Sequence, residues 1–91
     1  TARKPDISGF VIATQQMRTV VASFNILFID KGSSNGLEVG DMAKVISIDK
    51  YNNARTIGII QIISLKGQTA AAIVRESESV ISKGDEVRSM K

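Results

Sequence analysis

The chain has 91 residues, a hydrophobic share of 43% and a net charge of +3, which together predict one small globular domain. It contains no cysteine and no histidine, which excludes disulfides, thiol nucleophiles, Cys/His zinc sites and a histidine general base. No apolar run in the sequence approaches the roughly 20 residues that a membrane-spanning helix needs. The basic residues are scattered, so they predict a weak attraction to anions rather than a nucleic-acid footprint.

The first half of the chain is rich in strand-forming segments. It opens with the polar "TARKPD", which holds the only proline, and residues 1–7 are expected to form a linker or frayed tail. Residues 8–91 are expected to form a single small β-barrel domain. The segments "SGFVIAT", "RTVVASFN" and "ILFID" predict strands, because β-branched and aromatic residues favour them. The intervening "TQQM" is interpreted as a hairpin turn, although it lacks a strong turn pair.

The second half continues the same pattern. "MAKVISI" alternates as a strand does, and "DKYNNAR" predicts a hairpin loop. "TIGIIQIISL" predicts a strand buried on both faces, in which Gly58 indicates a bulge or a close backbone approach. "TAAAIVRES" lies between two turns and also predicts a strand, before "ESVISKGDEVRSM" closes the chain. About six or seven short antiparallel strands in an all-β chain are typical of a small closed or partly open β-barrel.

Three glycines stand four residues apart in "KGSSNGLEVGDMAKVI". The segment does not match a phosphate-binding P-loop, because Gly36 is followed by Leu37 and Glu38 rather than by lysine and a hydroxyl residue. It does not match a dinucleotide-binding fingerprint either, since the spacing differs and a strand follows. The segment is therefore interpreted as the joint between two strands.

A Gly-Asp pair occurs twice, each time after an apolar residue and before a strand. The glycine of each pair is expected to adopt an unusual backbone angle, and the aspartate to accept backbone N–H bonds. With the turn that precedes the first pair, the expected structural turns use Gly32, Asn35, Gly36, Gly40, Asp41, Gly84 and Asp85. A metal site at the two aspartates is the alternative, but no acidic cluster has the spacing of a calcium loop.

The acidic residues do not predict an enzyme. Glu76 and Glu78 flank Ser77 in a polar stretch that is interpreted as a solvated loop. No recognisable set of nucleophile, base and orienting group appears. The chain is therefore expected to have no catalytic residues, no cofactor and no metal site.

A longer pattern joins these features. The stretches "FNILFIDKGSSNGLEVGDMAKVI" and "ARTIGIIQIISLKGQTAAAIVRESESVISKGDEV" resemble the β-rich C-terminal domain of bacterial cell-envelope proteins that carry a LysM module. They are also similar to the C-terminal domain of flagellar assembly protein T. The positions that match the family pattern are Ile29, Asp30, Gly32, Gly36, Leu37, Gly40, Asp41, Val45, Ile57, Gly58, Ala72, Val74, Ile81, Gly84, Asp85 and Val87.

This resemblance implies a non-enzymatic protein-interaction or structural module of a flagellar or pilus-type assembly, located in the periplasm or cell envelope. Its partners would be other envelope proteins, with peptidoglycan reached only through a module outside these residues. The expected contact loop comprises Lys50, Tyr51, Asn52, Asn53 and Arg55, with the turn at residues 32–36 second. The alternative is that both segments are solvated turns that contact no partner. An exposed strand edge is a further route to a partner or to self-association.

The alternative class is a nucleic-acid-binding small β-barrel. Such barrels stack bases on exposed aromatic side chains beside basic residues. Phe10, Phe24 and Phe28 are expected to lie in the core, because they stand in apolar strands. Only Tyr51, beside Lys50 and Arg55, remains as a stacking platform, so nucleic-acid binding is the less favoured hypothesis.

Overall fold

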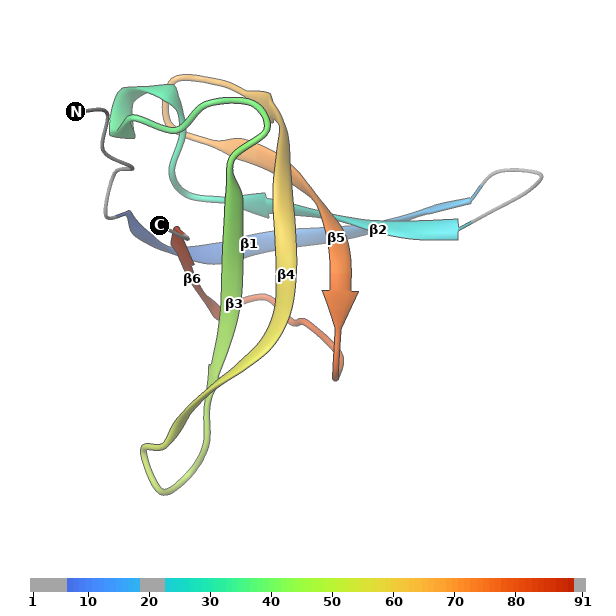
Figure 1. Ribbon diagram of the computed structural model, residues 1–91, viewed down its shortest axis with the longest axis vertical. Coiled ribbons are helices and arrows are strands. Elements are labelled where there is room, and N and C mark those ends of the chain that lie inside the picture. Colours follow the sequence, from blue (N-terminus) through green and yellow to red (C-terminus); the bar gives the residue numbers. More distant parts are fainter. Residues whose placement is uncertain (1–6, 19–22, 90–91) are drawn as a thin grey trace.

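The computed structural model describes residues 7–18 and 23–89 (Figure 1). These residues form six strands and, as the one helical element among them, a single turn of 3-10 helix, η1 (Ser33–Asn35). The strands are β1 (Ser8–Arg18), β2 (Ser23–Ile29), β3 (Met42–Ile48), β4 (Ala54–Leu65), β5 (Ala70–Ser77) and β6 (Glu86–Ser89).

The strands close into an antiparallel barrel. They pair in the order β1-β2-β5-β4-β3-β6, and β6 pairs back with β1. Closure gives each strand two neighbours, so the backbone groups that an open sheet would leave at its edges are largely satisfied. The predicted all-β fold and its closed barrel form are therefore confirmed.

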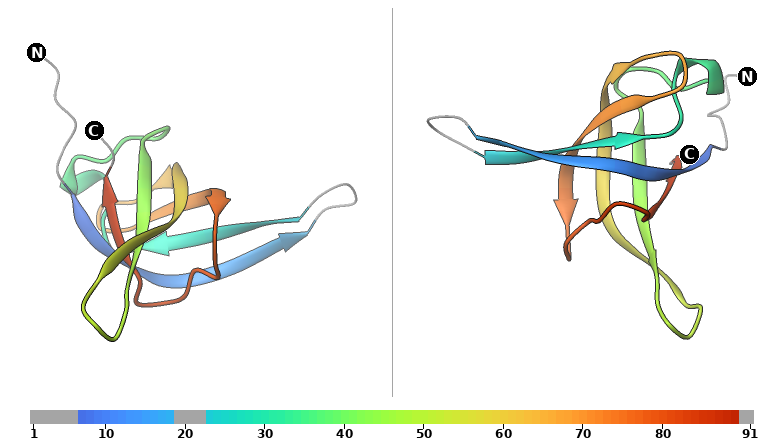
Figure 2. Two further views of the ribbon diagram at one scale, coloured as in Figure 1. Left: turned by 60° about the horizontal axis from the view of Figure 1, so that its bottom comes forward. Right: turned by 180° about the vertical axis from the view of Figure 1, so that it is seen from behind.

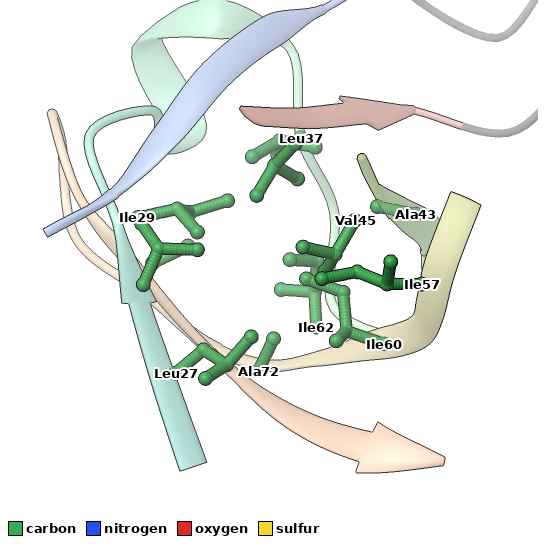
Figure 3. Packing of buried hydrophobic residues seen from close by; sticks show 12 residues of the cluster. Leu27, Ile29, Leu37, Ala43, Val45, Ile57, Ile60, Ile62 and Ala72 are labelled. Atoms are coloured by element: carbon green, nitrogen blue, oxygen red, sulfur yellow. The ribbon is translucent and has the colours of Figure 1, made fainter. Parts of the chain in front are cut away.

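Aliphatic side chains fill the barrel. Ile60, Val45 and Ala72 have no exposed surface, and Leu37 reaches into the same interior from the segment before β3 (Figure 3). The prediction that the phenylalanines belong to the core was wrong for Phe10, which is 51% exposed, and for Phe28, which is half-buried and not part of the core cluster. The side chain of Phe24 lies outside the described residues. Val11, the neighbour of Phe10, points inward, and alternation along β1 then directs Phe10 outward.

The segment "TQQM" is not a turn. Residues 14–17 lie within β1 and pair with residues 24–27 of β2. Polar residues suit this part of the strand, because it extends away from the barrel toward solvent (Figure 1). Of the strand predicted over residues 18–25, the part at residues 19–22 lies outside the described residues.

β4 is buried on one face only. Ile60 and Ile62 lie in the core, whereas Ile63 is 45% exposed, so the prediction of a strand buried on both faces was wrong. The outer face of a closed barrel meets solvent, which an apolar sequence does not reveal. The register shifts next to Gly58, where an added Cβ would lie 2.9 Å from Ile81 Cδ1.

The barrel consists of two halves with the same strand pattern. β1, β2 and β3 form the first half, and β4, β5 and β6 form the second. The pairing of Gly9 with Val87 between β1 and β6 corresponds to the pairing of Ile60 with Ala43 between β4 and β3. Exchanging the halves leaves the order of the strands around the barrel unchanged, so the fold has an internal two-fold pattern.

The first corner joins the halves. Gly40 has a φ of +96°, and its N–H donates to the carbonyl of Ile62 in β4 at 2.8 Å. The N–H of Ile62 donates in turn to the carbonyl of Asp41 at 2.8 Å. The Asp41 carboxylate accepts the N–H of Glu38 at 2.9 Å, immediately before β3 begins.

The second corner repeats this geometry in the other half. Gly84 has a φ of +98°, and its N–H donates to the carbonyl of Val11 in β1 at 2.8 Å. The N–H of Val11 donates to the carbonyl of Asp85 at 2.9 Å. The Asp85 carboxylate accepts the N–H of Ser82 at 2.9 Å, immediately before β6 begins. Each corner therefore closes on a strand of the opposite half.

Candidate interaction surface

The loop at residues 49–53 is a hairpin tip held by several internal hydrogen bonds. The Asp49 carboxylate accepts the N–H of Tyr51 at 2.8 Å and the N–H of Asn53 at 2.9 Å. Asn52 adopts a φ of +64°, and its N–H donates to the carbonyl of Asp49. Asp49 therefore holds the backbone of the tip, as a turn-forming aspartate does.

The side chains of this tip form an exposed amphipathic platform. Tyr51 is 73% exposed, and the Lys50 ammonium lies 5.3 Å from the centre of its ring. Arg55 is exposed at the start of β4, and Ile48 is 52% exposed at the end of β3. The structure thus places Lys50 against Tyr51, and Arg55 in the same hairpin, which projects from the barrel (Figure 1).

The turn at residues 32–36 packs against the chain itself. The Ser33 N–H donates to the carbonyl of Lys66 at 2.9 Å, and the Gly32 N–H donates to the Asn35 side chain at 3.0 Å. Gly36 has a positive φ of 91°, whereas Asn35 lies within η1 and has no positive φ. The backbone of this turn is therefore held against the turn between β4 and β5.

The carboxylates of the two corners, Asp41 and Asp85, hold their own backbone, as described above. No group of three or more potential metal ligands occurs among the described residues. The same part of the chain contains no helix long and apolar enough to cross a bilayer.

A second projection, the arm, consists of residues 14–18 of β1 and 23–25 of β2, which pair with each other but not with β5 or β6 (Figures 1 and 2). It leaves the barrel in a different direction from the tip at residues 49–53. The sequence pattern gave no signal for it, because a polar strand that leaves the barrel has the composition of a loop. The short turn at residues 66–69 occupies the equivalent place in the second half.

A cleft of about 470 Å³ opens where the arm leaves the barrel. Thr14, Asn25 and Leu27 line it from β1 and β2, and Val80 and Ile81 line it from the segment between β5 and β6. The cleft therefore separates this end of the arm from the segment between β5 and β6.

No family model matches the chain, and no curated protein matches it. The geometry of the barrel and its two projections is therefore the main basis for a functional proposal.

Proposed function

We propose that the chain is a non-enzymatic protein-interaction or structural module of a bacterial cell-envelope assembly. The observation that carries this proposal is the pair of hairpins that project from an aliphatic barrel. The aliphatic core makes the barrel a rigid scaffold, and the two hairpins present their side chains beyond its surface. The exposed Tyr51 with Lys50 and Arg55 is the preferred contact surface, because tyrosine and arginine are enriched at protein interfaces.

The envelope assignment rests on the motif resemblance described above. It implies a periplasmic or envelope location and other envelope proteins of a flagellar or pilus-type assembly as partners. Peptidoglycan would be reached only through a LysM module outside these residues.

An affinity experiment tests the proposal. The purified domain is immobilised and exposed to a bacterial envelope extract, in parallel with Tyr51→Ala and with the control Val80→Ala. Val80 is 84% exposed but lies outside both projecting hairpins. We expect the same envelope protein to bind to the wild type and the control, and at least tenfold less to bind to Tyr51→Ala. Equal binding to all three would contradict the assigned surface.

A nucleic-acid-binding barrel remains the second candidate, and the Lys50–Tyr51 contact favours it. Binding of a single-stranded oligonucleotide that weakens with salt and is lost in Tyr51→Ala would support this candidate. Retained protein capture without oligonucleotide binding would exclude it as the role of Tyr51.

A further inference from the structure

Among the described residues, the closed barrel leaves a long edge of β1 without a strand partner. β6 pairs with β1 only at residues 8–10, and the second corner pairs with Val11. Beyond that point, residues 12–18 pair with β2 on one side and with no other described strand. At about 3.3 Å per residue, this free edge is roughly 23 Å long.

Residues 13–17 of this edge lack the features that normally block strand pairing. Natural edge strands are protected by charged residues, proline, bulges or short length. Residues 12–18 have the sequence "IATQQMR", in which only Arg18 is charged and no proline occurs. A bulge does lie at residue 12, but residues 13–18 continue in regular pairing with β2.

An additional strand would also stabilise the arm. A two-stranded ribbon is at best marginally stable in water, and three or more strands are needed for independent stability. The equivalent hairpin of the second half turns back at residues 66–69, so barrel closure does not need the extension. The extra strand residues therefore call for a role other than closing the sheet.

We propose that two copies of this chain pair through the free edges of their β1 strands, antiparallel and centred on Gln15. The arms then form one four-stranded sheet, β2-β1 of one copy followed by β1-β2 of the other. This deepens the proposed function by placing self-association on the arm and leaving the Tyr51 tip free for a different partner.

The sequence of the edge suits a second copy better than a charged partner strand. In a pairing centred on Gln15, Arg18 lies opposite Ile12 of the second copy, so no like charges face each other. The remaining residues are neutral and pair without charge repulsion. A two-fold antiparallel contact also closes on itself, which yields a dimer rather than a filament.

Cysteine cross-linking tests the pairing directly, because the chain has no native cysteine. Opposite residues of antiparallel strands lie about 4.5–5.5 Å apart at Cα, within the range for a disulfide. Gln15→Cys is compared with Ser64→Cys; both residues are exposed, and Ser64 corresponds to Ala13 in the short hairpin of the second half. We expect the Gln15→Cys variant to form covalent dimers at least tenfold faster under mild oxidation.

Sedimentation equilibrium provides a second, reversible measurement. The wild-type chain should show a concentration-dependent dimer, and Gln15→Lys should weaken it at least tenfold, because two introduced charges meet at the two-fold axis. Ser64→Lys adds the same charge and should leave the dimer unchanged. Circular dichroism should give the same β spectrum for all three proteins.

A wild-type chain that stays monomeric up to millimolar concentration would overturn self-pairing, as would equal cross-linking at both cysteine positions. Binding of a heterologous strand to a monomeric chain would overturn it too. A failure of this pairing can be distinguished from a failure of the proposed function. The proposed function is tested by capture of an envelope protein through Tyr51, and the arm does not contain Tyr51.

Discussion

Two glycines of this chain are required for different physical reasons. Gly40 stands at a corner where the backbone has a φ of +96°, and an added Cβ would meet nothing within 4 Å. Gly32 has extended backbone angles, but an added Cβ would lie 2.3 Å from the carbonyl oxygen of Lys66 and 2.7 Å from the Thr69 nitrogen. The first glycine is needed for its conformation and the second for the close approach of two backbones.

Gly40→Val should lower the free energy of unfolding by about 1–3 kcal/mol, because a β-branched residue is strained at positive φ. Urea denaturation followed by circular dichroism measures the change. Gly84→Val should give a similar loss, since the second corner has the same geometry. Wild-type stability in both variants would mean that the corners tolerate ordinary residues.

Gly32→Ala should lower the free energy of unfolding by about 2–3 kcal/mol, because backbone atoms of the neighbouring turn would have to move. Gly67→Ala is the matched control in that same turn. Its Cβ would meet only the Ser34 hydroxyl oxygen, at 3.6 Å, and its effect should stay within about 0.5 kcal/mol. Equal effects of the two substitutions in urea denaturation would contradict the packing argument.

At the scale of elements, the two hairpins of the barrel differ in one respect. They share a bulge at the corresponding place, residues 11–13 and 62–64, which leaves Ile12 and Ile63 exposed on the outside. Beyond the bulge, β4 and β5 join at once through residues 66–69, whereas β1 and β2 continue as the arm. The part of the hairpin that closes the barrel is thus separable from the part that projects.

Replacing residues 15–26 by the sequence of residues 66–69 should therefore preserve the barrel. We expect an all-β circular dichroism spectrum and cooperative urea unfolding. The free energy of unfolding should fall by about 2 kcal/mol, because the replacement removes Ile26, which is only 8% exposed. Loss of cooperative unfolding would show that the arm belongs to the folding core.

For the whole molecule, the two-fold pattern brings the first and last described residues together. The Ile7 N–H donates to the Ser89 hydroxyl oxygen at 3.0 Å, and the Ser89 N–H donates to the Ile7 carbonyl at 3.0 Å. The link between β6 and β1 would thus be the counterpart of the loop at residues 49–53, which joins the two halves. The pairing between strands, rather than the chain connection at the loop 49–53 or between β6 and β1, therefore holds the barrel closed.

A circular permutant tests this property. Joining Lys91 to Thr1 and opening the chain between Tyr51 and Asn52 should give the same β spectrum, with a free energy of unfolding lower by about 1–2 kcal/mol from lost hydrogen bonds at the tip. Opening the chain between Ser33 and Ser34 is the comparison, and should destabilise the fold more, because both N–H groups bond to the turn at residues 66–69. Equal stability of the two permutants, measured by urea unfolding, would contradict this.

Several elements were accessible to sequence reasoning because local chemistry decides them. The alanine-rich segment before Arg75 was predicted as a strand from its short length between turns, and it forms β5. The hairpin at residues 49–53 followed from Asp49 and two asparagines. The length of β1 could not be predicted, because a polar segment such as residues 14–17 has the same composition whether it forms a loop or a solvated strand.

The sequence by itself determined an all-β chain with an aliphatic core and two Gly-Asp corners, because β-branched residues and positive-φ glycines act through local conformation. Only the tertiary structure decided that each corner closes on the opposite half, that Phe10 and Ile63 face outward, and that β1 leaves the barrel with a free edge. Those features depend on which strands become neighbours, and pairing between distant strands is set by the packing of the whole barrel rather than by any one segment.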